Sequence, residues 1–234
     1  MTEQTSPVPA ASGAYTTAPT EPAQSYLPGM GFDWLLPLYD PITRALGMAS
    51  THRQLVAQAA VRPGHRILEI GCGTGNLTLL VKRLHPDAHV IGLDPDPRAL
   101  ARATRKAARE ALSVRLDRGF AGELPYSDAT FDRALSAFMF HHLGPGEKQT
   151  ALQEVRRVLA PGGSLHLLDF GGAKERSDGF VARLSHRNKR LQDNFGDRIP
   201  TLMLEAGLCD PAEMGHRVTL LGRYTFYRAA RPID

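Results

Sequence analysis

The chain has 234 residues, 42% of them hydrophobic and 22% charged, and a formal net charge of +4. This composition suits one globular α/β domain with a tail, and the mild basic excess does not require a nucleic-acid partner. No apolar run is long enough to form a transmembrane segment, and the N-terminus lacks the basic and apolar regions of a signal peptide. The two cysteines, Cys72 and Cys209, make no disulfide framework, so we expect a cytoplasmic protein.

The N-terminal part of the chain changes composition near residue 25. Residues 1–25 are rich in Ser, Thr, Ala and Pro, contain no Lys or Arg and show no apolar periodicity, which predicts a disordered or loosely ordered tail. Residues 26–234 form the predicted domain. It begins over 26–62 with two or three short helices, interrupted by Pro37 and Pro41.

Apolar runs and helical periodicity alternate through the middle of the chain, which is typical of βαβ units and a mostly parallel sheet. Helices are predicted over 75–86, 95–112 and 146–160. Strands are predicted at 66–71, 88–94, 113–119, 131–138 and 164–170. The C-terminal segment breaks the alternation, because it contains two strand patterns joined by a turn at Gly222 and so predicts a final hairpin.

Residues 67–78 read ILEIGCGTGNLT, with Gly71, Gly73 and Gly75 between the first predicted strand and the first helix. Such a turn lets a ligand approach the backbone closely and predicts a nucleotide-like ligand. A dinucleotide site requires G-x-G-x-x-G, but Asn76 stands where its last glycine would fall, and no P-loop lysine follows. The spacing disfavours an NAD-dependent oxidoreductase, which remains an alternative.

Four motifs in chain order carry a family resemblance. They are the E-x-G-x-G-x-G turn from Glu69, the acidic Asp94 ending the second predicted strand, LPYSDATFD at 124–132 and RVLAPGG at 157–163. Together they resemble the class I S-adenosylmethionine-dependent methyltransferases, and among these the ubiquinone/menaquinone-type small-molecule enzymes. The resemblance implies a Rossmann-like three-layer α/β sandwich whose seven-stranded, mostly parallel sheet has an antiparallel last strand.

The resemblance also implies S-adenosylmethionine as the cofactor, with Glu69 organising the loop and the methionine ammonium. Asp94 would bind the ribose hydroxyls through charge-assisted hydrogen bonds, or alternatively serve the N-terminus of the next helix. Where the family usually has Gly-Asp-Ala near the adenine, this chain has Gly119-Phe120-Ala121, so a phenyl ring that can stack on the purine replaces a carboxylate. The implied cofactor-binding residues are Tyr39, Glu69, Gly71, Cys72, Gly73, Thr74, Gly75, Asn76, Asp94, Pro95, Phe120, Ala121 and Ser136.

Several acceptor classes are disfavoured by what the chain lacks. The Asp/Asn-Pro-Pro-aromatic signature of nucleic-acid amino methyltransferases is absent after the fourth predicted strand, and neither cysteine is placed as a nucleophile. The basic face of the helix over 95–112 is interpreted as solvated, so no nucleic acid is expected. We expect a small-molecule substrate in a pocket roofed by residues 26–62 and by a substrate-side insertion over 171–200.

His141 and His142, just after the fourth predicted strand, face the predicted methyl end. One of them could take a proton from a hydroxyl acceptor, or the pair could shape the substrate pocket. No metal site is expected, because Pro86 breaks the helix between His85 and His89. The sequence predicts methyl transfer to a small molecule, in secondary or quinone-type metabolism, with a fold recruited to cyclisation or decarboxylation as the alternative. It sets no oligomeric state.

Overall fold

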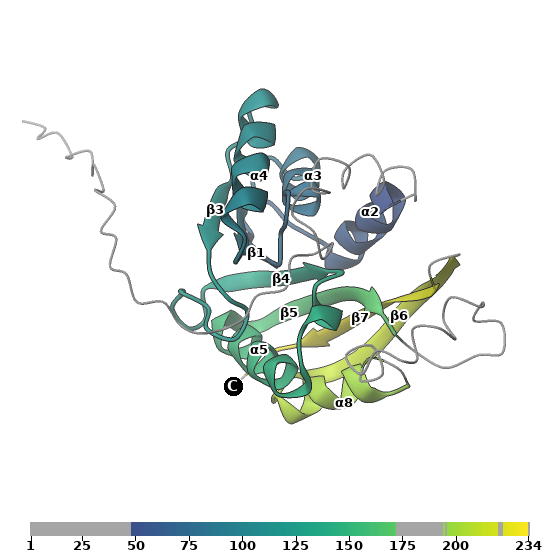
Figure 1. Ribbon diagram of the computed structural model, residues 1–234. Coiled ribbons are helices and arrows are strands. Elements are labelled where there is room, and N and C mark those ends of the chain that lie inside the picture. Colours follow the sequence, from purple (N-terminus) through teal and green to yellow (C-terminus); the bar gives the residue numbers. More distant parts are fainter. Residues whose placement is uncertain (1–47, 172–193, 195, 220–221, 234) are drawn as a thin grey trace, which may run out of the picture.

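The computed structural model describes residues 48–171, 194, 196–219 and 222–233, which form a seven-stranded sheet between two layers of helices (Figure 1). The strands are β1 (Arg66–Ile70), β2 (His89–Asp94), β3 (Arg115–Arg118), β4 (Phe131–Ala137), β5 (Leu159–Phe170), β6 (Cys209–Thr219) and β7 (Gly222–Ala230). One face carries α2 (Met48–Ala59), α3 (Asn76–Leu84) and α4 (Pro97–Arg109), and the other carries α5 (Pro145–Val158) and α8 (Arg198–Glu205).

The sheet has the strand order β3-β2-β1-β4-β5-β7-β6. β1 pairs in parallel with β2 and β4, β2 with β3, and β4 with β5. β7 alone opposes its neighbours, because it is antiparallel to both β5 and β6. The predicted three-layer α/β sandwich with an antiparallel last strand is confirmed.

Each face of the sheet buries its own apolar core. β1 shows this directly, because Leu68 belongs to the core under α5 and α8 while its neighbour Ile67 belongs to the core under α2 and α3. A strand buried on both faces needs no polar alternation, which explains the nearly continuous apolar run in the sequence. α5 buries Ala151, Leu152 and Val155 at helical spacing, and the last two belong to the first of these cores.

α4 begins at Pro97, two residues after the start of the predicted helix, and its start fixes the loop after β2. Pro97 occupies the first turn, where its missing N–H is not needed, and the Asp96 side chain accepts a hydrogen bond from the Arg98 N–H at 2.8 Å. The capping carboxylate is therefore Asp96. Asp94 therefore does not cap α4.

Most element boundaries differ from the sequence-based prediction by one to three residues, and those of β5 and β6 differ more. The helix predicted over 146–160 ends at Val158, and the Pro-Gly-Gly segment lies inside β5, where Gly162 adopts a φ of +73°. β6 begins at Cys209, well before the strand pattern in the sequence, because register shifts between Cys209 and Ala212 and again before Gly215 interrupt its alternation.

Several predictions lie outside the described residues. They include the tail over 1–25, Tyr39 and the first part of the predicted lid, most of the insertion over 171–200, and the residues just before Gly222. α2 is the described part of the predicted lid. In the part of the chain that the structure describes, no helix is both long and apolar enough to cross a membrane.

Candidate functional site

The carboxyl ends of the central strands meet at one edge of the sheet. The turn after β1 lies between the ends of β2 and β4, because β1 pairs in parallel with both. The chain order of the strands reverses direction at β1, and ligands of open α/β sheets bind at such a point. This edge therefore brings together the glycine turn, Asp94 and the segment that begins at Phe138.

The three glycines of the turn all adopt left-handed conformations, with φ of +75° at Gly71, +51° at Gly73 and +79° at Gly75. A Cβ at Gly71 would collide with Met139, and a Cβ at Gly75 would lie 2.9 Å from the Ala103 Cβ, so both allow close internal packing. A Cβ at Gly73 would meet nothing within 4 Å. The backbone of Gly73 thus borders open space that a ligand can enter.

Asp94 connects two loops at this edge. Its Oδ2 accepts a hydrogen bond from the Gly73 N–H at 2.8 Å, and its Oδ1 accepts one from the Asp96 N–H at 2.9 Å. Burial raises the pKa of Asp94, and the two backbone N–H groups oppose that rise. A carboxylate has about four lone-pair positions, so it can still accept hydrogen bonds from hydroxyl groups of a ligand.

Glu69 lies in β1 with only 3% of its surface exposed. The Thr78 hydroxyl, in the first turn of α3, donates a hydrogen bond to its Oε2. Burial raises the pKa of Glu69 to about 8, although the Thr78 hydrogen bond and the Lys106 ammonium favour the ionised form. A cationic group placed beside Glu69 would offset its desolvation, so the site is suited to a positively charged ligand.

Lys106, which sequence reasoning did not select, reaches the glycine turn from α4. Its Nζ lies 2.5 Å from the Asn76 Oδ1 and 3.4 Å from the Thr74 Oγ1. These contacts use the side chains of two predicted cofactor residues to fix the start of α3. The one signal for Lys106 in the sequence was its place beside the apolar residues Ala103 and Ala107. The structure shows that both alanines are buried on the inner side of α4.

The segment after β3 carries the predicted adenine contacts. Phe120 is half-buried and lies outside both cores, whereas Ala121 packs against the core under α5. The Glu123 N–H donates to the Phe120 carbonyl at 3.2 Å and closes a tight turn. Phe120 therefore lies in a partly exposed turn just after β3.

His141 pairs with a buried carboxylate that sequence reasoning missed. Its Nδ1 lies 2.7 Å from the Asp169 Oδ1, and Asp169, near the end of β5, is fully buried. Asp169 also accepts hydrogen bonds from the backbone N–H groups of His141 at 3.2 Å and Phe170 at 2.7 Å. The His142 ring lies against the His141 ring, with 4.1 Å between centroids. The geometry therefore places the His141 ring against a buried acid.

The remaining predicted residues have other local roles in the structure. The buried Ser136 hydroxyl donates to the Ile70 carbonyl at 3.1 Å and so links β4 to β1. The Cys72 thiol is buried, which raises its pKa and suits a packing role. The Pro95 carbonyl accepts a hydrogen bond from the Arg118 Nε at 3.3 Å. Within the described ranges, no group of three or more His, Cys, Asp or Glu residues could hold a metal ion.

Such an edge, with a left-handed glycine turn, a buried acid before it and a second acid on β2, defines an α/β protein that binds a nucleoside-containing cofactor. Residues 67–163 match the model of a methyltransferase domain. The chain is 38% identical over 156 residues to a demethylmenaquinone methyltransferase of Thermus thermophilus, covering 65% of this chain and 70% of that protein. It is 33% identical over 223 residues to a demethylmenaquinone methyltransferase of Symbiobacterium thermophilum, covering 82% and 87%.

The fold also matches solved structures. The YcgJ protein of Bacillus subtilis superimposes with a TM-score of 0.65 at 18% identity, covering 79% of this chain and 99% of that one, which shows a shared fold. The chain belongs to the S-adenosylmethionine-dependent methyltransferases and is related to the quinone methyltransferases among them. Its cofactor is S-adenosylmethionine, and the site fits this molecule. Gly73 borders open space, and the two buried acids suit a sulfonium, an ammonium and ribose hydroxyls.

Proposed function

We propose that this enzyme methylates a hydroxylated aromatic ring of the quinol type, and that His141 removes the hydroxyl proton while Asp169 orients His141. The observation that carries the proposal is the 2.7 Å contact between His141 Nδ1 and a fully buried carboxylate at the edge of the sheet. The relatives named demethylmenaquinone methyltransferases support a quinol-type acceptor.

The Asp169 contact sets the tautomer of His141. A carboxylate accepts hydrogen bonds, so this contact favours the neutral tautomer of His141 that carries its proton on Nδ1 and its lone pair on Nε2. The two backbone N–H groups that donate to Asp169 hold this carboxylate in one orientation. The arrangement suits a general base with a fixed ring.

S-adenosylmethionine supplies a methyl group attached to a positively charged sulfur. The acceptor hydroxyl gives its proton to His141 Nε2, and the resulting oxyanion increases the electron density of the ring. The bound cofactor would give its methyl carbon to this electron-rich acceptor and leave as a neutral thioether, and where the acceptor atom is a ring carbon the hydrogen on it would leave as a proton to solvent. Positioning of the two reactants can supply about 7–11 kcal/mol of the barrier reduction in favourable cases, and the base adds to this.

The cofactor is proposed to lie along the edge described above. Glu69 and the backbone of the glycine turn hold the methionine end, Asp94 accepts hydrogen bonds from the ribose hydroxyls, and Phe120 with Ala121 borders the adenine. The two N–H groups already bound to Asp94 hold it in place for the ribose. We also propose that residues 26–62 and 171–200 cover the acceptor, which places this small-molecule pocket at the carboxyl edge beside His141.

An acceptor panel tests the proposal. The enzyme is incubated with methyl-labelled S-adenosylmethionine and with reduced 1,4-naphthoquinone, reduced benzoquinone, a catechol or a primary amine, and S-adenosylhomocysteine release and product mass are measured. We expect methylated product with the reduced quinones and less or none with their oxidised forms. Turnover with the amine alone would contradict the proposed acceptor. Conversion of an acceptor without methyl incorporation would favour the alternative of a recruited, non-methylating fold.

A further inference from the structure

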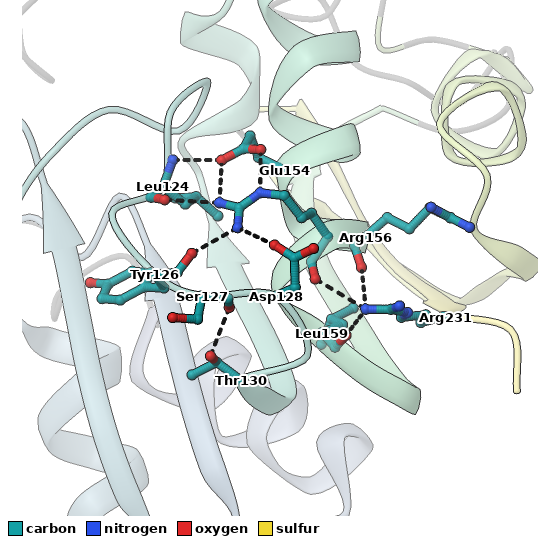
Figure 2. Close-up of polar contacts among 10 residues, drawn as sticks. Leu124, Tyr126, Ser127, Asp128, Thr130, Glu154, Arg156, Leu159 and Arg231 are labelled. Atoms are coloured by element: carbon teal, nitrogen blue, oxygen red, sulfur yellow. Dashed lines mark hydrogen bonds and ion pairs between the residues drawn. The ribbon is translucent and has the colours of Figure 1, made fainter. Parts of the chain in front are cut away.

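One face of α5 forms a platform for the segment that joins β3 to β4. Thr150, Glu154 and Arg157 follow one another at spacings of four and three residues, so they share a face of the helix. A Cβ at Gly122 would lie 3.6 Å from the Thr150 Cγ2, so the turn with Phe120 rests against this face. The next residues along the segment contact Glu154 and Arg157 (Figure 2).

The Arg157 guanidinium binds this segment through several hydrogen bonds. Its Nη2 donates to the Leu124 carbonyl at 2.9 Å, and its Nη1 donates to the Tyr126 carbonyl at 2.7 Å and to Asp128 at 2.8 Å. Its Nε and Nη2 both donate to Glu154 at 2.7 Å. These contacts match the five N–H donors of a guanidinium, so a lysine ammonium with three donors cannot reproduce them.

Glu154 binds the backbone N–H of Leu124, whose carbonyl Arg157 binds. Its Oε2 accepts a hydrogen bond from the Leu124 N–H at 2.8 Å, so Glu154 and Arg157 together hold both backbone polar groups of Leu124. The hydrogen bond from Arg157 lowers the pKa of Glu154 and keeps it ionised. The Leu124 side chain is buried in the core under α5. Leu124 is thus fixed through its backbone and its side chain.

The other end of the Phe120 turn contacts the backbone of Asp94, the last residue of β2. The Gly119 N–H donates to the Asp94 carbonyl at 3.3 Å, and the turn from Phe120 to Glu123 follows directly. The turn is therefore held between Asp94 at one end and Leu124 at the other. Moving Leu124 changes the position of Phe120 relative to Asp94, because only the tight turn separates them.

We propose that Arg157 and Glu154 are positioning residues for the cofactor, because they hold the Phe120 turn at the distance from Asp94 that the adenine end requires. This inference rests on the cofactor placement proposed above. Neither side chain contacts the cofactor. Their effect passes through Leu124 to Phe120, so it acts on cofactor affinity and not on the acceptor.

Arg157→Lys tests the inference, with Arg156→Lys as the matched control. Arg156 is the adjacent residue on α5, and its Nε donates to the Gly207 carbonyl at 3.0 Å, on the segment between α8 and β6. Both variants keep the charge and lose guanidinium contacts to a loop. Calorimetric titration with S-adenosylhomocysteine, well below the melting temperature of each variant, should show affinity about tenfold weaker for Arg157→Lys and unchanged for Arg156→Lys.

Steady-state kinetics and a double-mutant cycle separate positioning from general destabilisation. We expect Arg157→Lys to raise the KM for S-adenosylmethionine with little change in the acceptor KM or in kcat at saturation. In the Phe120→Ala background the same substitution should weaken cofactor binding much less than tenfold, because its effect passes through Phe120.

Equal cofactor affinities of the two lysine variants would overturn the inference, and so would full additivity with Phe120→Ala. Failure of the wild-type enzyme to bind S-adenosylhomocysteine would instead contradict the cofactor placement itself. Normal methyl transfer without the Arg157 effect would remove the positioning role and leave the proposed function intact.

Discussion

Replacing Glu69 with Gln tests the electrostatics of the cofactor site. Glutamine has the shape of a protonated glutamic acid, and its carbonyl oxygen can still accept the Thr78 hydrogen bond. Burial raises the pKa of Glu69 from an ordinary value near 4.5 to about 8, so the folded protein holds this proton more tightly than the unfolded chain does. The stability that this proton contributes is complete below about pH 4.5 and is lost as the pH rises to about 8.

The size of the effect follows from the width of this window. Each pKa unit corresponds to about 1.4 kcal/mol, and between about pH 6 and about pH 8 nearly two units of the window are crossed. Glu69 alone should therefore lower the free energy of unfolding of the cofactor-free protein by about 2–3 kcal/mol over this range. The Gln variant lacks this contribution, so its stability should change less with pH.

Urea denaturation of wild type and Glu69→Gln at about pH 6, 7 and 8 measures this difference. We expect wild type to lose about 2–3 kcal/mol relative to the variant as the pH rises. Excess S-adenosylmethionine should reduce the loss, because its positive charges favour the ionised form of Glu69. Parallel pH profiles of the two cofactor-free proteins would refute the view that Glu69 is a buried acid with a raised pKa.

Substitutions at three further positions test single contacts at the site. Asp94→Asn should weaken S-adenosylhomocysteine binding about tenfold by calorimetry. It should also lower the melting temperature, because the amide oxygen can replace one of the two accepting carboxylate oxygens but the amide nitrogen cannot replace the other. Unchanged affinity would contradict the ribose role of Asp94. Phe120→Ala should weaken binding about tenfold and Phe120→Asp should recover much of the loss, whereas tight binding by the Ala variant would mean that the adenine is held elsewhere. Thr78→Val removes a hydrogen bond that lowers the pKa of Glu69, so the pKa should rise further and the loss of stability with rising pH should extend above about pH 8; an unshifted profile would contradict that contact.

The sequence predicted the fold well because its strongest signals are local. β1 is a nearly continuous apolar run because both of its faces are buried, and Pro97 marks the start of α4. β6 could not be placed correctly, because its register shifts remove the alternation that marks a half-buried strand. Boundaries set by pairing with a neighbour are not visible in a local pattern.

The same distinction applies to the site. The glycine turn could be predicted because its residues are consecutive and its spacing is specific. Asp169 was missed because its partner, His141, becomes its neighbour only when β4 and β5 pair. An acid near the end of a buried strand was the available signal. Ser136 was predicted to bind the cofactor, and only the structure shows that its hydroxyl donates a hydrogen bond to the Ile70 carbonyl of β1.

The most direct test of the account is the methyl-transfer rate in a single turnover, with saturating S-adenosylmethionine and the best acceptor of the quinol panel. His141→Gln and Asp169→Asn are compared with His142→Gln as the matched neighbour. We predict that His141→Gln slows transfer by about 10²–10⁴ with cofactor affinity near wild type, that Asp169→Asn is also impaired, and that His142→Gln stays close to wild type. Transfer at the wild-type rate by His141→Gln, or an equal loss in His142→Gln, would contradict the assignment of His141 and Asp169 as the base and its orienting acid.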